Sequence, residues 1–102
     1  MANVFKNYTS ESVGTSEVTV YTVPADTTAI ILGCNLASTY SSSVDVTVKI
    51  NTTHLIKDVP VPSGSALSVL DGKIVAEAGD TIKVTSDTAS SVDVVVSVME
   101  QS

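Results

Sequence analysis

The stretch VDVTVKI at residues 44–50 decides the fold prediction, because apolar and polar residues alternate along it. A period of two places successive side chains on opposite faces of a strand, so that one face is buried and the other is solvated. The stretch VDVVVSVM at residues 92–99 repeats this alternation, although Val95 and Met99 make its second face partly apolar. Both stretches are therefore predicted to be strands that cover a hydrophobic core.

Seven further short runs, rich in apolar and β-branched residues, are also predicted to be strands. They cover residues 4–9, 17–23, 27–36, 55–61, 65–70, 73–76 and 81–85. Turn-forming residues separate the runs, and no window of the sequence shows apolar residues at helical spacing. Between two of the runs, Asp71-Gly72 predicts a two-residue hairpin, because both residues tolerate a positive φ.

Together the nine runs predict an all-β fold, namely an antiparallel β-sandwich or small barrel of the jelly-roll or Ig-like type, with eight or nine short strands. Parallel strands would need crossover helices, for which the sequence has no signal. The length of 102 residues fits one domain. We expect residues 1–15 to form an N-terminal arm or a first strand, and residues 16–102 to form a single β-sandwich domain.

One short motif occurs twice in the chain. Residues 42–48 (SSVDVTV) and residues 90–96 (SSVDVVV) agree at six of seven positions. Two strands that meet the same half-buried packing requirement would explain the repeat, and a duplicated half-domain is the alternative. Two copies are too few to indicate a solenoid.

The charge of the chain argues against two classes of partner. Eleven acidic residues and five lysines, with no arginine, give a net charge of −6. Such a surface repels phosphate backbones, lacks the arginines that read base edges, and is repelled by anionic lipid. We therefore expect no nucleic-acid partner and no membrane partner. The start of the sequence also lacks the features of a secretory signal, so synthesis inside a cell is expected.

The residues that usually carry chemistry are few and scattered. The chain has one histidine, His54, and one cysteine, Cys34, and no serine lies in a nucleophile-elbow motif. We expect His54 to be an ordinary surface residue and Cys34 to be buried and unreactive. The sequence thus predicts no enzyme activity and no cofactor. A calcium ion held by loop aspartates such as Asp71 or Asp80 is left open.

The surface composition favours association with other proteins. Serine and threonine exceed a quarter of the chain, whereas charged residues make up 16%, below the roughly 25% of typical domains. A hydroxyl-rich surface of low charge is cheap to desolvate against a partner. We predict interface roles for aromatic residues and for prolines of the VPVP segment at 59–62, which should be a sheet edge or an extended arm because proline cannot donate to a ladder. The candidates are Phe5, Tyr8, Tyr40, Pro60 and Pro62.

The sequence resembles a group of small virion structural proteins of tailed bacteriophages. The resemblance rests on four blocks within residues 20–99: YTVPADTTAII at 21–31, VPVPSGS at 59–65, LSVLDGK at 67–73 and EAGDTI at 77–82. It implies that the chain is part of a virion, either a capsid decoration protein or a tail-associated component. Acidity favours the outer face of the shell over a position against packaged DNA.

The leading hypothesis is therefore an outer capsid decoration, or cement, protein that stabilises the shell by bridging major capsid subunits. It would be made in the host cytoplasm and reside on the outer capsid surface of the virion. The expected partners are the major capsid protein, or tail proteins, and further copies of the chain in a homo-oligomer, for which a trimer is expected. The first alternative is a tail, neck or fibre module. A second is a carbohydrate-binding module, which would need exposed aromatic residues.

Overall fold

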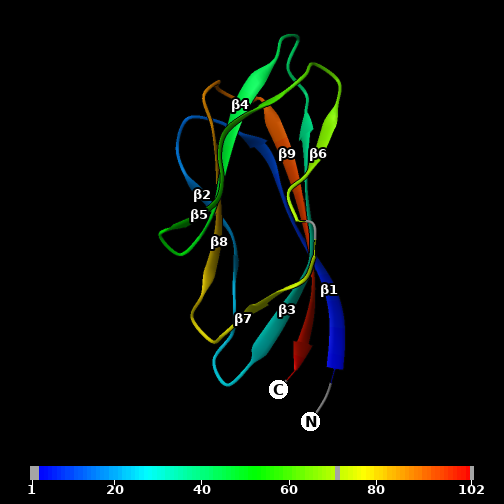
Figure 1. Ribbon diagram of the computed structural model, residues 1–102, viewed down its shortest axis with the longest axis vertical. Helices are drawn as coiled ribbons and strands as arrows, with labels where there is room; N and C mark the ends of the chain where they lie inside the picture. Colours follow the sequence, from blue (N-terminus) through cyan, green and yellow to red (C-terminus); the bar gives the residue numbers. More distant parts are fainter. Residues whose placement is uncertain (1–2, 71, 102) are drawn as a thin grey trace.

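The computed structural model describes residues 3–70 and 72–101, and within these ranges the chain forms nine strands and no helix (Figure 1). The strands are β1 (Asn3–Val13), β2 (Val18–Thr22), β3 (Thr28–Ser38), β4 (Val44–Ile50), β5 (Thr53–Val61), β6 (Ala66–Ser68), β7 (Ile74–Ala76), β8 (Thr81–Ser86) and β9 (Val92–Gln101). The all-β prediction is confirmed. No helix that could cross a membrane is found in the described ranges.

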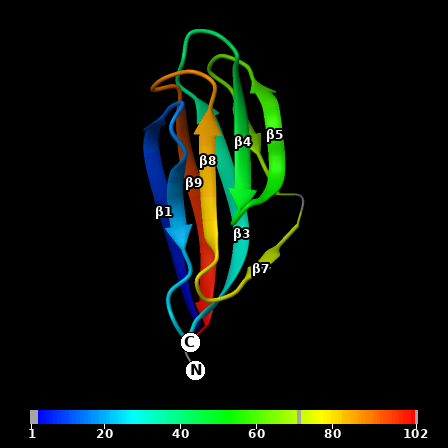
Figure 2. The ribbon, with the colours of Figure 1, turned by 90° about the vertical axis from the view of Figure 1, so that its left-hand side faces the viewer.

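The strands form two antiparallel sheets that lie face to face (Figure 2). One sheet has the order β1-β9-β3-β6, with β7 also paired to β3, and the other has the order β2-β8-β4-β5. With β6 and β7 taken as one interrupted strand, this is the order of a jelly roll. The predicted β-sandwich is thus confirmed, in its jelly-roll form. β1 begins and β9 ends at the same end of the molecule, where Asn3 lies opposite Gln101 (Figure 1).

Branched aliphatic side chains from both sheets fill the core. The alternate valines of β4, from Val44 to Val48, and those of β9, from Val92 to Val98, are at most 1% exposed. These two strands contain the last five residues of each copy of the repeated motif, and each lies inside a different sheet, with neighbours on both sides. The same packing requirement, met once in each sheet, is sufficient to explain the repeat.

The prediction of a hairpin at Asp71-Gly72 is wrong. Asp71 lies outside the described residues, but the strands on either side of it, β6 and β7, both pair with β3 and not with each other. β6 pairs with residues 35–37 and β7 with residues 29–31, in succession along one edge of β3. A hairpin of two three-residue strands would be marginal alone, whereas pairing with the 11-residue β3 extends an existing sheet.

The prolines lie at a sheet edge, as predicted. β5 is the outermost strand of its sheet, and Pro60 lies within it, opposite Asp45. Pro62 follows directly after β5. At an edge, the missing proline N–H costs no ladder hydrogen bond. At the other end of the chain, residues 3–13 form β1, the outermost strand of the five-stranded sheet, so the N-terminal segment is a first strand in this structure.

Gly14, just after β1, is expected to be intolerant of a side chain. A Cβ atom there would lie 3.1 Å from the Ser90 nitrogen and 3.2 Å from the Ala89 Cα, both backbone atoms that cannot rotate away. Gly14→Ala should lower the free energy of unfolding by about 1–2 kcal/mol. Gly33→Ala is the control, since nothing lies within 4 Å of its added Cβ, and it should not destabilise the fold. Urea denaturation followed by circular dichroism measures both, and equal losses would contradict the steric explanation.

Candidate functional site

The outer face of the five-stranded sheet carries a row of apolar side chains. Phe5 on β1 lies opposite Met99 on β9. Ile30 on β3 lies opposite Met99 on one side and Val75 of β7 on the other. Paired residues of an antiparallel sheet point to the same face, so these four side chains form one continuous row, here called the apolar row. Phe5 is 70% exposed and Val75 is 63% exposed, which is unusual for side chains of this size.

The sheet surface beside the apolar row is hollowed. A β-bulge in β3 leaves Leu32 pointing outward, with 37% of its surface exposed. Leu32 and Phe5 are among the residues that line a depression of about 270 Å³, together with Asn7 and Ser97. The Ser97 hydroxyl donates a hydrogen bond of 2.7 Å to Asn7 Oδ1. These two polar side chains thus bond to each other, and Phe5, Leu32, Lys6 and Val98 complete the lining.

The outer face of the four-stranded sheet is different, because it is charged. Glu17 forms ion pairs with Lys49 at 3.1 Å and with Lys83 at 4.0 Å. On the five-stranded sheet, three successive rows of outward-facing paired residues carry no charge. They are the apolar row, the row of Asn7 and Ser97, and the row of Thr9 and Val95. Charge begins only at the margin, with Asp93 in the next row. Since charged residues are depleted at the centres of protein interfaces, the five-stranded sheet offers the better contact face.

The structure places two of the predicted interface residues on β1. Phe5 is part of the apolar row and points to solvent. Tyr8 is only half-buried, but its hydroxyl donates to Glu100 and its ring lies against Tyr21, with centroids 4.4 Å apart. Tyr8 therefore has a role inside the sandwich, which its sequence context did not indicate.

The other three predicted residues lie at the opposite end of the sandwich from Phe5. Tyr40 follows β3, is 42% exposed, and accepts a hydrogen bond through its carbonyl oxygen from Ser63, the residue after Pro62. Pro60 lies at the same end, in the last residues of β5. The two well exposed aromatic side chains, Phe5 and Tyr40, are thus far apart and cannot together form a platform for a sugar. This arrangement does not favour the carbohydrate-binding alternative.

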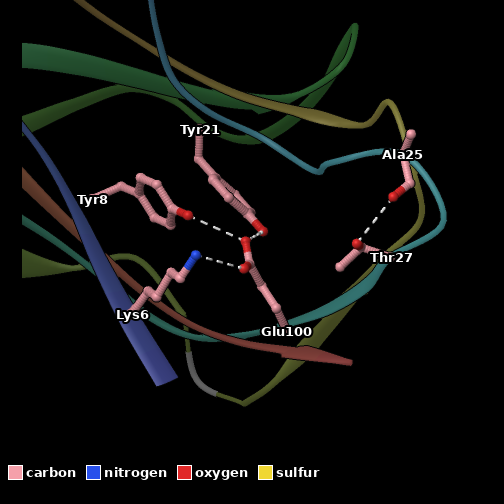
Figure 3. Close-up of polar contacts among 6 residues, drawn as sticks. All are labelled: Lys6, Tyr8, Tyr21, Ala25, Thr27 and Glu100. Carbon is pink, nitrogen blue, oxygen red and sulfur yellow. Dashed lines mark hydrogen bonds and ion pairs between the residues drawn. The ribbon is translucent and has the colours of Figure 1, made fainter. Parts of the chain in front are cut away.

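A cluster around Glu100 joins the two sheets near the chain ends (Figure 3). Glu100, on β9, is only 7% exposed. Its Oε2 accepts hydrogen bonds from Tyr21 at 2.6 Å and from Tyr8 at 3.2 Å, and its Oε1 lies 3.3 Å from Lys6 Nζ. Tyr21 comes from β2 in the facing sheet, whereas Lys6 and Tyr8 come from β1. The carboxylate therefore connects an edge strand, an inner strand and the opposite sheet.

These contacts shift the pKa values of Glu100, Tyr21 and Lys6. The hydrogen bond from Tyr21, helped by Lys6 and Tyr8, holds the pKa of Glu100 below its ordinary value of 4.5 and outweighs the opposing effect of burial. Burial, followed by the bond to Glu100, raises the pKa of Tyr21. The bond to Glu100 raises the pKa of Lys6. The cluster is thus a carboxylate that accepts hydrogen bonds from two tyrosine hydroxyls and pairs with Lys6, which is a structural arrangement.

The loop aspartates do not assemble a metal site in the part of the chain that is described. No group of three or more His, Cys, Asp or Glu side chains comes close enough to hold an ion there. The Asp80 carboxylate accepts hydrogen bonds from the Asn51 amide and the Glu77 backbone N–H, and these lower its pKa. Asp71 lies outside the described residues. His54 is exposed on β5, next to the turn between β4 and β5.

Cys34 is buried in the core face of β3, with 2% of its surface exposed. Burial raises the pKa of its thiol to about 11, so the reactive thiolate is scarce at neutral pH. We expect the native protein to react with a thiol reagent at pH 8 at least about 100-fold more slowly than the urea-unfolded protein. Thr52→Cys, in an exposed turn, supplies the internal control. Two thiols that react equally fast in the native state would show that Cys34 is accessible.

Comparison with known proteins supports the fold. No protein-family model matches the sequence, and no curated protein matches it either. Among solved structures, the chain is similar to one described as Bacillus endospore appendages that form a novel family of disulfide-linked pili. The two share 14% sequence identity, the match covers 98% of this chain and 88% of the other, and the TM-score is 0.59. At this identity the similarity establishes the β-sandwich fold that both chains share.

Proposed function

We propose that the chain is a non-enzymatic structural subunit of a large protein assembly. The observation that carries this proposal is the outer face of the five-stranded sheet, where the apolar row is exposed and the paired outward positions from it to the row of Val95 carry no charged residue. An isolated domain gains nothing from exposing Phe5 and Val75, whereas a subunit buries such residues against a neighbour. The cluster around Glu100 joins the two sheets by hydrogen bonds and an ion pair, and so stabilises the sandwich.

The assembly proposed is a bacteriophage virion, and the place proposed is the outer capsid surface, where the chain would act as a decoration protein that bridges major capsid subunits. The four sequence blocks within residues 20–99 support the virion, and the net charge of −6 supports a position away from packaged DNA. A protein that binds only the assembled shell stabilises it by mass action. The proposed site of synthesis is the host cytoplasm.

A filament or tail module is the second candidate, and the similarity to a pilus subunit favours it. That neighbour is described as disulfide-linked. In this chain the sole cysteine, Cys34, is buried in the core and its thiol has a raised pKa. A filament built from this chain would therefore have to be held by non-covalent contacts such as those of the apolar row.

Electron microscopy distinguishes these candidates. Antibodies raised against the purified protein are coupled to gold and applied to particles released from the organism that carries the gene. Gold on capsids supports the decoration role. Gold on tails or filaments contradicts that role and supports the second candidate, a filament or tail module. Particles that carry no gold, alongside protein that stays in the soluble fraction, would contradict an assembly role. Co-sedimentation with expanded and unexpanded empty shells then tests whether binding requires the expanded state.

A further inference from the structure

We infer, as an extension that rests on the proposed assembly role, that the apolar row and the depression beside it bind a second copy of this chain, with the two five-stranded sheets packed face to face. The surface is defined by Phe5, Ile30, Leu32, Val75 and Met99. It lies on four strands that are far apart in the sequence. Four steps lead to a second copy as its occupant.

The first step is shape. Among the described residues, Phe5 is the most exposed large apolar side chain, and it borders the depression that Leu32 also lines. The depression holds about 270 Å³, several times the roughly 30 Å³ that one water molecule occupies. A two-fold axis would let Phe5 of each copy enter the depression of the other. Projection and hollow on the same face are what a self-complementary, isologous contact requires.

The second step is charge. Each copy carries a net charge of −6, so two copies repel unless their charges stay apart. Contact through the apolar row brings together paired positions that hold no charged residue, and leaves the charged outer face with Glu17, Lys49 and Lys83 on the two outermost surfaces. With sheets about 10 Å apart, those two surfaces are separated by several sheet spacings, well beyond the Debye length of roughly 8 Å at physiological salt. The opposite mode of packing would bring the charged faces together.

The third step is area. The face is four strands wide and four paired rows long, from the row of Asn3 and Gln101, through the apolar row, to the row of Val95. At about 4.8 Å between strands and 6.8 Å between rows, such a face offers roughly 500 Å² per copy. Two copies then bury about 1,000 Å² in total, which is the lower limit of specific interfaces. The protein should therefore dimerise only weakly in solution. At the high local concentration of an assembly, most copies should form this contact.

The fourth step is the satisfaction of polar groups. The polar pair in the depression, Ser97 and Asn7, is already joined by a hydrogen bond of 2.7 Å. When an apolar ring covers this pair, each side chain therefore keeps the other as its hydrogen-bond partner. The cost of burying an unpaired polar group, which would oppose binding, is avoided. Sheets that pack face to face in this way usually cross at about 30°, and the free edge of β1 remains open on both copies.

Sedimentation analysis of the full chain from low to high micromolar concentration tests the dimer. The wild-type protein should shift from monomer toward dimer as the concentration rises. Phe5→Lys places a charge in each half of the contact and should weaken the dimer at least about tenfold. Tyr40→Lys is the matched control, because it adds the same charge at an exposed aromatic position at the opposite end, and it should dimerise like the wild type.

Amide NMR spectra recorded over the same concentrations locate the contact. Signals of Asn7, Leu32 and Ser97 should move with concentration, whereas those of Lys49 and Lys83 should not. A wild-type protein that stays monomeric, or an oligomer that Phe5→Lys leaves unchanged, would overturn the inference. If the wild type is monomeric but binds particles, and Phe5→Lys abolishes that binding, the surface binds another protein and the assembly role stands. If the protein dimerises through this surface but binds no particle, the result supports the inferred contact and contradicts the proposed function.

Discussion

Leu36→Ala is expected to lower the free energy of unfolding by about 2–5 kcal/mol, the largest effect of any single substitution considered for this chain. Leu36 is 0% exposed and lies on β3, opposite Val94 of β9 and Leu67 of β6. Removing its side chain leaves a cavity between strands that are fixed on both sides and cannot close over it. Because small domains are stable by only about 5–15 kcal/mol, part of the population should unfold at moderate temperature.

Leu32→Ala is the matched control for this prediction. Leu32 lies four residues earlier on the same strand, but the bulge in β3 turns it outward and leaves it 37% exposed. We expect it to cost less than about 1 kcal/mol, as surface substitutions do. Urea denaturation should be measured at low protein concentration, so that dimerisation does not add to the stability. Equal losses for the two leucines would mean that the burial difference within β3 does not govern stability.

The two leucines also separate stability from assembly. Leu32 lines the depression on the proposed contact face, whereas Leu36 faces the core. Leu32→Ala should therefore weaken the dimer while the monomer remains stable. The core and the contact surface thus lie on opposite faces of a single strand, and each can be changed without the other.

Most of the fold could be predicted from the sequence because its signals are local. Each of the nine predicted runs overlaps one observed strand, since a period of two in residues such as Val44 to Ile50 is visible without any tertiary information. The pairing of β6 and β7 was not visible in this way. Asp71-Gly72 satisfies the local chemistry of a hairpin, but the partner of both strands is β3, about 40 residues earlier. Long-range pairing outweighed the local preference of the turn.

The candidate site was predicted only in part, for the same reason. Phe5 was predicted as an interface residue, but the apolar row also needs Ile30, Val75 and Met99, which sequence separation hides. The partly apolar second face of residues 92–99 was the one local sign of it. Glu100 gave no sign at all, because a lone acidic residue near the end of a strand resembles any solvated carboxylate.

The cluster around Glu100 yields the second large effect. Glu100→Ala is expected to lower the free energy of unfolding at neutral pH by about 2–3 kcal/mol, because it leaves the buried Tyr21 hydroxyl without its acceptor and Lys6 without its counter-ion. Tyr21→Phe should cost more than Tyr8→Phe, since the Tyr21 bond measures 2.6 Å and is buried, whereas the Tyr8 bond measures 3.2 Å and is part-buried. Urea denaturation at pH 7 gives all three values.

The pH dependence identifies the charge as the cause. The pKa of Glu100 is lowered in the folded state from an ordinary 4.5, chiefly by the bond from Tyr21, so its carboxylate contributes stability that is fully present above about pH 4.5 and is lost as the pH falls through the folded-state pKa. Glu100→Gln mimics the protonated acid. Its deficit against the wild type should be constant from neutral pH down to about pH 5 and should shrink in more acid solution. A deficit that stays the same at pH 7 and pH 3 would show that shape alone, and not the ionised carboxylate, joins β1, β2 and β9. A deficit that shrinks would identify the ionised carboxylate as the group that holds the edge strand β1, and with it Phe5 of the contact surface, in place on the sandwich.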